Sequence, residues 1–183
     1  CLALTSNKVK KLNLPLMSLI NKSRTQTAFT VSIESKRGIS TGISAHDRSK
    51  TIKVAIKPSS SKKDIVSPGH VFPLVAKNGG VLERAGHTEA SVDISKLAKL
   101  NPSAVICEVM NEDGTMARYN DLIPFAKKHN LKIAKIEDLI SFRLKNERLI
   151  KNVLTKKIKI KKFGNFDIKT FKNKLDGSEH YAL

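Results

Sequence analysis

Residues 93–110, DISKLAKLNPSAVICEVM, hold two different patterns in direct succession. The first part, 93–103, has Asp93 as a cap, leucines three positions apart and an Asn-Pro stop, which together predict a short helix. The second part, 104–110, is an apolar run with a single acid, and the turn NEDGT follows it. Such a run predicts a central strand. A helix followed at once by a strand indicates a layered domain of the α/β or α+β class.

The flanking sequence continues this succession, so we expect a mixed sheet with flanking helices. Alternating or short apolar runs predict strands at 27–35, 51–56 and 131–136 and an edge strand at 71–76, which contains Pro73. Caps and apolar spacing predict helices at 121–130 and 137–154. The stretch 57–70 is rich in Ser, Lys, Pro and Gly, which predicts a loop.

The character of the chain changes near residue 150, where we place a boundary between a first domain, 1–150, and a second stretch, 151–183. The second stretch alternates as KIKIKKF and FDIKTF, turns at LDGSE and ends in HYAL. This pattern predicts two or three short strands, too few to bury a core of their own. We therefore interpret 151–183 as the opening of a further domain.

Composition indicates a globular protein with a strong excess of positive charge. The formal net charge is +18, from 34 basic and 16 acidic residues. A basic protein attracts anions such as nucleic acid or phosphorylated metabolites. Aromatic residues make up only 5% and Trp is absent, so base-stacking platforms are scarce. Nucleic-acid binding through the lysine-rich segment 151–174 is retained as the alternative function, and a lysine-rich bias over an ordinary fold is the simpler account.

Two further features narrow the class of protein. No run of 18 or more apolar residues occurs, so no membrane-spanning helix is expected. The two cysteines, Cys1 and Cys107, form neither a disulfide framework nor a paired-cysteine zinc motif, which favours a reducing, cytoplasmic compartment.

One candidate site lies in residues 79–90, GGVLERAGHTEA. A guanidinium at Arg84, the histidine His87 and the hydroxyl of Thr88 fall within five positions, with Gly86 between them. Arginine binds a phosphate oxyanion with two parallel hydrogen bonds, and glycine lets backbone N–H groups approach the anion. A polar surface turn explains the same residues.

Three other residues are candidates for chemistry. Glu108 interrupts the apolar run 104–110, where an acid is costly unless it is paired, metal-bound or protonated, and a raised carboxyl pKa suits acid–base chemistry. A position at the end of the strand, facing outward, is the simpler account. His70, in SPGHVFP, is structural or catalytic. An Asp47–Arg48 ion pair in a turn is the first explanation of SAHDRSKT, and the alternative is that Thr51 offers its hydroxyl to a phosphate.

Five motifs taken in order resemble 3,4-dihydroxy-2-butanone 4-phosphate synthase. They are TGISAHDRSKTI (41–52), SPGHVFPL (67–74), GGVLERAGHTEASVDI (79–94), CEVMNEDGTMAR (107–118) and KHNLKIAKIEDLI (128–140). The resemblance is co-linear from Cys1 to about Arg148. Residues 163–183, FGNFDIKTFKNKLDGSEHYAL, resemble the start of GTP cyclohydrolase II, the domain that follows the synthase in bifunctional riboflavin proteins.

The resemblance implies a reaction and roles for the candidate residues. The family converts D-ribulose 5-phosphate to 3,4-dihydroxy-2-butanone 4-phosphate and formate with a divalent metal, Mg²⁺ or Mn²⁺, and acts as a homodimer. By position, His87 is implied as a metal ligand and Arg84, Ala85, Gly86, His87 and Thr88 as residues that line the substrate. Thr51 is implied as a further phosphate contact. His70 and Glu108 match residues that transfer protons, and His70 is expected to act across the dimer interface.

The chain departs from the family pattern in two places. The acidic loop of the type D-D-x-x-R-E-x-E-G-D is absent, and CLALT is typical of a strand already in progress, so we expect missing upstream sequence and an inactive fragment. The zinc-binding cysteines of the cyclohydrolase domain are also absent, so neither zinc nor that second activity is expected of these residues. A metal-dependent hydrolase built from His70, His87 and Glu108 is a third hypothesis, although no H-E-x-x-H motif supports it.

Overall fold

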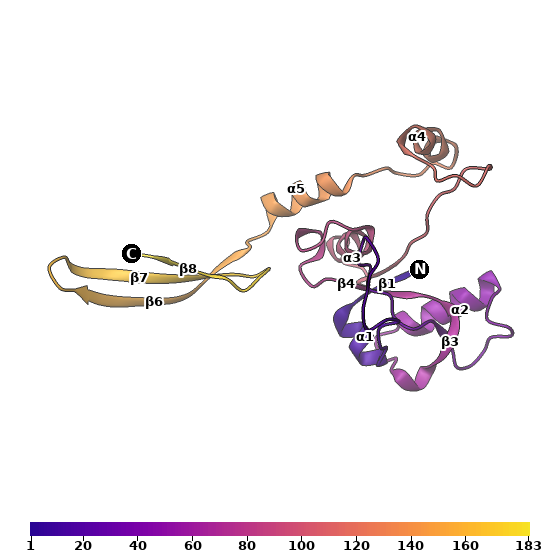
Figure 1. Ribbon diagram of the computed structural model, residues 1–183, viewed down its shortest axis with the longest axis horizontal. Coiled ribbons are helices and arrows are strands. Elements are labelled where there is room, and N and C mark those ends of the chain that lie inside the picture. The colour runs from indigo at the N-terminus through magenta and orange to yellow at the C-terminus, as the bar shows by residue number, and fades with distance from the viewer. The chain divides into compact units, whose positions relative to one another are not determined.

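The computed structural model describes all 183 residues and divides them into two compact units, Cys1–Ile136 and Glu137–Leu183 (Figure 1). The division comes earlier than the boundary predicted near residue 150. No helix is both long enough and apolar enough to cross a bilayer.

A three-stranded mixed sheet with helices on both faces organises the first unit, as the sequence predicted. The central strand β1 (Leu2–Thr5) pairs in parallel with β4 (Pro73–Ala76) and antiparallel with β5 (Ser103–Val105). Because side chains alternate along a strand, Leu2 and Leu4 face one side of the sheet and Ala3 the other. The leucines pack in a core with α1 (Ser6–Leu12) and α2 (Ala45–Ile56), whereas Ala3 packs with α3 (His87–Leu97). The predicted edge strand around Pro73 is thereby confirmed as β4.

A second, two-stranded ladder lies against α2. Strand β2 (Ile33–Ser35) pairs antiparallel with β3 (Ile65–Val71), and the register shifts between Ile33 and Glu34. A Cβ at Gly69 would overlap the backbone of Ile33, so a glycine is required where the two strands approach. The strand predicted at 27–35 is therefore present only in its last third, and Phe29 forms an isolated bridge to Leu74 instead.

The prediction of a strand at 51–56 is wrong, because these residues complete the helix α2. The Ser44 side chain caps the helix by accepting the N–H of Asp47 at 3.0 Å. Asp47, Thr51 and Ala55, spaced four apart, form its buried face, which is the spacing of one helix side. The loop predicted at 57–70 is also wrong in its second half, since the one-turn helix η1 (Lys62–Asp64) and strand β3 occupy it.

The helix and the strand in residues 93–110 also differ from those predicted. Helix α3 begins at His87 rather than at Asp93, and Asp93 lies buried inside it, where its carboxylate accepts the N–H of Val81 at 2.8 Å. Strand β5 covers only Ser103–Val105 and lies at the edge of the sheet. Its pairing with β1 ends in hydrogen bonds between Cys1 and Ile106, so residues 107–110 have no partner strand.

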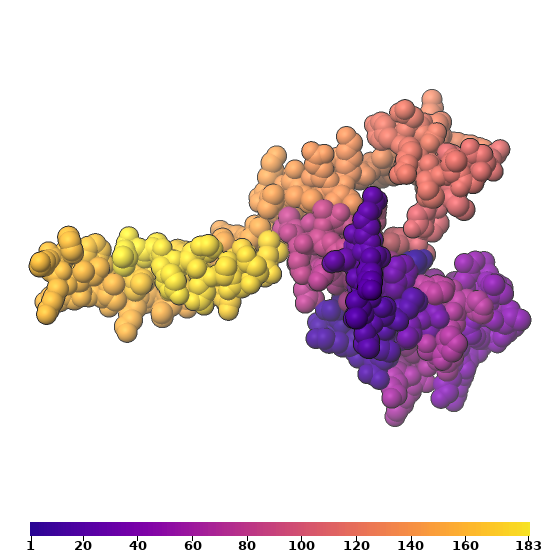
Figure 2. All heavy atoms as spheres, viewed as in Figure 1, coloured from indigo at the N-terminus to yellow at the C-terminus, as the bar shows by residue number.

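The remaining elements follow the predictions in part. Helix α4 (Tyr119–Lys128) is confirmed, with Pro124 inside it. The strand predicted at 131–136 is absent, and α5 (Ile136–Asn146) ends earlier than the helix predicted to residue 154. In the second unit, β6 (Ile150–Ile160), β7 (Gly164–Asn173) and β8 (Glu179–Ala182) confirm the predicted strands and pair antiparallel. β6 and β7 are longer than predicted, and the spheres of these strands, orange to yellow in Figure 2, form a narrow, elongated body.

Candidate functional site

Arg84 and Glu89 form a partly buried ion pair where the chain enters α3. The segment follows the short helix η2 (Gly80–Leu82). Nη1 of Arg84 lies 2.6 Å from Oε2 of Glu89, whose side chain is only 1% exposed. The other oxygen of Glu89 accepts the N–H of Lys77 at 3.1 Å. The buried carboxylate therefore fixes the Arg84 guanidinium and ties the loop after β4 to the first turn of α3.

The same guanidinium is also held from a distant part of the chain. Nη2 of Arg84 donates to the carbonyl of Thr25 at 2.9 Å and to the hydroxyl of Thr27 at 3.0 Å. Only Nε has no hydrogen-bond partner among the contacts of Arg84. Arg84 is thus preorganised, and because both N–H groups of Nη2 already have acceptors, Nε–H is left as a single donor for a ligand.

The beginning of α3 is suited to an anion. Gly86 is the N-cap and supplies no side-chain cap. The first N–H groups of a helix have no acceptor within the helix, and the helix dipole adds positive potential there. His87 is exposed at the first position of the helix and Thr88 is buried at the second. The structure therefore places Arg84, His87 and Thr88 around one helix end.

Gly86 is required by contact rather than by its dihedral angles. Its φ is −119°, which any residue adopts. A Cβ at this position would overlap Nη1 of Arg84 and lie 2.7 Å from Oε2 of Glu89. The absence of a side chain at Gly86 is what lets the Arg84–Glu89 pair close against the backbone.

His70 lies in β3 and pairs across the ladder with Glu34 of β2, Nδ1 against Oε1. The His70 side chain is 43% exposed, and that of Glu34 is 15% exposed. The residue was predicted at a junction of loop and strand; the structure puts it in a strand, next to a register shift. An imidazole fixed on one nitrogen and open on the other is suited to proton transfer.

The expectation that Glu108 is an acid in a central strand is wrong. The residue is exposed and lies in irregular chain after β5, because the ladder with β1 has ended by Ile106. The argument that made Glu108 a candidate, an acid buried in a central strand, therefore does not hold. A role for it in the reaction stays a prediction from the family resemblance.

Thr51 is enclosed rather than open to a ligand. It is 0% exposed on the buried face of α2, and its hydroxyl accepts the N–H of Ser35 at 3.0 Å. This contact explains the residue through packing of α2 on β2. The predicted Asp47–Arg48 ion pair is absent, since the Asp47 carboxylate accepts from the hydroxyl of Ser40 and the N–H of Gly42.

No hydrogen bond or ion pair joins His70, His87 and Glu108. No group of three or more His, Cys, Asp or Glu side chains is arranged to hold a metal ion, so the hydrolase built from these three residues has no structural support. Mg²⁺ prefers carboxylate oxygens, and no carboxylate is grouped with His87. The residues present therefore do not by themselves fit a magnesium site, and no reaction step is assigned to a metal.

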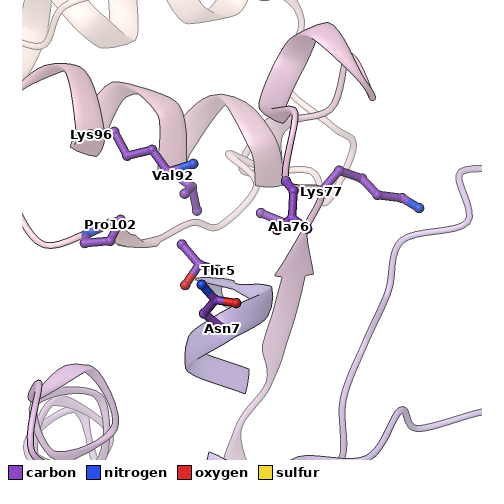
Figure 3. Close-up of a pocket in the computed structure, with 8 residues that line it drawn as sticks. Thr5, Asn7, Ala76, Lys77, Val92, Lys96 and Pro102 are labelled. Carbon is purple, nitrogen blue, oxygen red and sulfur yellow. The ribbon is translucent and has the colours of Figure 1, made fainter. Parts of the chain in front are cut away.

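A pocket of about 260 Å³ lies at the ends of β1 and β4 but contains none of the predicted site residues. In Figure 3, Lys96 lies on α3 above the pocket, whereas the side chain of Lys77 extends away from the other labelled residues. Lys96 is already near Asp93, at 3.8 Å, and Lys77 near Glu83, at 3.9 Å. The pocket therefore does not gather free positive charge as a phosphate site would.

Comparison with known proteins settles the family. The family model described as 3,4-dihydroxy-2-butanone 4-phosphate synthase matches residues 1–142. The chain belongs to this synthase family. The match covers the whole sheet and the segment from Arg84 to Thr88, which confirms the resemblance drawn from the five motifs.

Individual relatives match most or all of the chain. The riboflavin biosynthesis protein RibBA of Aquifex aeolicus is 52% identical over 185 residues, which cover all of this chain and 45% of the relative. The crystal structure of RibBX, a two-domain synthase from A. baumannii, is similar with a TM-score of 0.86 at 45% identity, over all of this chain and 54% of that one. A synthase structure in complex with two magnesium ions has a TM-score of 0.73 at 35% identity, over 80% of this chain and 73% of that one.

The chain spans about half the length, or less, of the curated relatives that match all of it. The likeness over 137–183 is shared by a RibBA protein and by the two-domain synthase. It therefore does not single out the start of GTP cyclohydrolase II, and that assignment stays a prediction.

Two site residues were missed from the sequence, Glu34 and Glu89. Glu34 was taken only as a polar position in an alternating strand, and Glu89 only as one more polar residue of GHTEA. Glu34 and His70 are 36 positions apart, so the local sequence pattern does not show that they pair. Glu89 and Arg84 are five positions apart, and the charge pair ERAGHTE within GGVLERAGHTEA was the signal that could have indicated it.

Proposed function

We propose that the protein converts D-ribulose 5-phosphate to 3,4-dihydroxy-2-butanone 4-phosphate and formate, a step of riboflavin biosynthesis. The observation that carries the proposal is the fixed Arg84 beside the open end of α3, in a chain of the synthase family. The Nε–H of Arg84 and the N–H groups of the first turn of α3, which have no acceptor within the helix, suit a phosphate monoester. Thr88, which is 4% exposed at the second position of the helix, is proposed as a further contact. Ala85 and Gly86 complete the backbone that would line it.

His70 and Glu108 are proposed to move protons during enolisation and rearrangement of the sugar. Enolisation needs one group to take a proton from carbon and another to protonate oxygen. His70 has an open nitrogen, and Glu108 is exposed and accessible. His87 is proposed as one nitrogen ligand of a divalent cation, Mg²⁺ or Mn²⁺, and the family's acidic loop would contribute further ligands.

The test compares formate release by matched variants of the protein that carries the family's amino-terminal acidic loop, under saturating Mg²⁺. His87→Ala and Glu108→Ala should each abolish turnover. The matched controls His180→Ala and Glu112→Ala change exposed residues of the same types and should leave turnover close to that of the unmodified protein. Near-normal activity in both site variants would refute the assignment of these residues.

Activity of the 183-residue chain alone is a separate question. The expectation that this fragment is inactive rests on the missing acidic loop, and neither the family match nor the relatives support it. It is tested by assaying the chain with and without an added amino-terminal loop of the family type. Substantial formate release without the loop would remove that expectation and leave the proposed reaction standing.

A homodimer with His70 acting across the interface is proposed from family resemblance. Mixing the His70→Ala and His87→Ala chains tests it, because mixed dimers then regain one intact site. Activity no greater than that of the two separate variants would argue against a shared site.

A further inference from the structure

The His70 imidazole has one partner in the structure, and that partner is Glu34. Nδ1 of the ring contacts Oε1 of the carboxylate. No hydrogen bond to Nε2 is present, and the ring is 43% exposed while the acid is 15% exposed. Glu34 therefore lies behind the ring and leaves the outer nitrogen open to a ligand.

Two glycines make the space in which the Glu34 carboxylate lies. A Cβ at Gly42 would overlap the carboxylate and lie 2.9 Å from its Oε2. A Cβ at Gly69 would lie 2.5 Å from Cγ of Glu34. The Glu34 side chain is thus enclosed by backbone from both directions, so its position is set by the fold.

The turn that contains Gly42 is itself fixed to α2. The carboxylate of Asp47, only 4% exposed, accepts the N–H of Gly42 at 3.1 Å and the hydroxyl of Ser40 at 2.8 Å. On the other side, the hydroxyl of Ser32 accepts the N–H of Gly69 at 3.0 Å. Both walls around Glu34 are therefore held by hydrogen bonds.

We propose that Glu34 is a positioning residue for His70: it accepts the Nδ1–H, fixes the ring and keeps the lone pair on Nε2 for the substrate. A carboxylate on one imidazole nitrogen selects the tautomer and stabilises the imidazolium that forms when the other nitrogen takes a proton. A proton removed from substrate carbon would pass to Nε2, and the resulting positive charge would lie next to Glu34. The catalytic role of Glu34 rests on the proposed function, whereas the predicted tautomer of His70 does not.

The tautomer is tested on the unmodified full chain by ¹⁵N NMR of labelled histidine. At an alkaline pH at which the ¹⁵N shifts show a neutral ring, His70 should show a protonated Nδ1 and an unprotonated Nε2. His70→Gln assigns the signal. Glu34→Gln should shift His70 toward the Nε2–H form, and the exposed control Glu112→Gln should not. An Nε2–H form in the unmodified protein would overturn the proposal, even if Glu34→Gln fails to fold.

The catalytic consequence is tested on an active form of the protein. Glu34→Gln should lower kcat by about tenfold to a hundredfold, the range seen when the partner of a functional histidine is removed, with a smaller change in KM. If kcat is unchanged in Glu34→Gln while His70→Ala loses activity, the positioning role of Glu34 is wrong. The proposed reaction is not affected by that result. Absence of any formate release would refute the reaction, and the NMR result would still decide the pairing.

Discussion

At the scale of single residues, the buried carboxylate of Glu89 holds the candidate site in position, although the sequence did not single it out as a catalytic or binding residue. It fixes Arg84 and also accepts the N–H of Lys77. From sequence, the cluster of Arg84, His87 and Thr88 was recognisable because its members are neighbours in the chain. Glu34 was not recognisable as a support, because its partner His70 lies 36 positions away. Glu89 lies only five positions from Arg84, and its role was missed because the sequence does not show that its carboxylate is buried.

Gly86→Ala tests whether the fixed Arg84 binds the phosphate. The added methyl overlaps the Arg84–Glu89 pair, so the guanidinium should move and KM for ribulose 5-phosphate should rise by about tenfold, the equivalent of about 1.4 kcal/mol. Steady-state kinetics measures it. Gly114→Ala is the control, because its added methyl meets nothing within 4 Å although its φ is +84°. An unchanged KM for Gly86→Ala would contradict the assignment of Arg84.

Thr51→Val separates a structural role from a phosphate contact. The substitution keeps the shape but leaves the N–H of Ser35 without its acceptor, so the free energy of unfolding should fall by about 1–3 kcal/mol. Urea unfolding measures it, with the exposed Thr155→Val as the control. Unchanged stability together with a raised KM would restore Thr51 as a phosphate residue.

At the scale of elements, α2 shows why short apolar patterns mislead. Ile52, Val54 and Ile56 alternate as in a strand, yet all three pack against the core from a helix. Two features distinguish the helix from a strand. Ser44 caps it seven residues before the predicted strand, and Asp47, Thr51 and Ala55 recur every four residues on its buried face. Helix α4 was predictable to within two residues at each end, although its N-cap is Arg118 and the predicted cap Asp121 lies in its first turn.

Asp47 should make the start of α2 sensitive to acid. Hydrogen bonds, the strongest from the Ser40 hydroxyl, lower the pKa of Asp47 from its ordinary value of 3.8. A carboxyl with a lowered folded-state pKa stabilises the fold above its unfolded pKa, and this stabilisation is lost as pH falls through the folded value. Urea unfolding measured from pH 7 to pH 3 gives the difference in free energy of unfolding between the unmodified chain and Asp47→Asn. This stability gap should be constant near neutral pH.

That gap should narrow once the pH falls below 3.8. Other aspartates with a lowered pKa, such as Asp64 and Asp113, are common to both proteins, so the difference isolates Asp47. A gap that widens on acidification would contradict the assignment.

At the scale of the whole molecule, composition and alternation were enough to predict a mixed sheet with flanking helices and a separate stretch of strands. They were not enough to order the strands, because β1, β4 and β5 pair across long sequence separations. The domain boundary near residue 150 stays a prediction, although the two compact units of the structure divide between Ile136 and Glu137.

The basic second unit raises the alternative of nucleic-acid binding. An electrostatic contact of this kind weakens steeply as salt increases. We expect only weak RNA binding at physiological salt, measured by fluorescence anisotropy with the full chain. Tight binding that falls steeply with salt and is lost when lysines of 151–174 are changed to glutamine would favour the alternative instead.

The central claim is tested most directly by following the carbon that the reaction expels. Ribulose 5-phosphate labelled with ¹³C at C4 is incubated with Mg²⁺ and the protein carrying the family's amino-terminal loop, and the products are read by ¹³C NMR. The account predicts labelled formate together with unlabelled 3,4-dihydroxy-2-butanone 4-phosphate, and loss of both in His87→Ala. Retention of the label in a five-carbon phosphate, or no turnover at all, would contradict it.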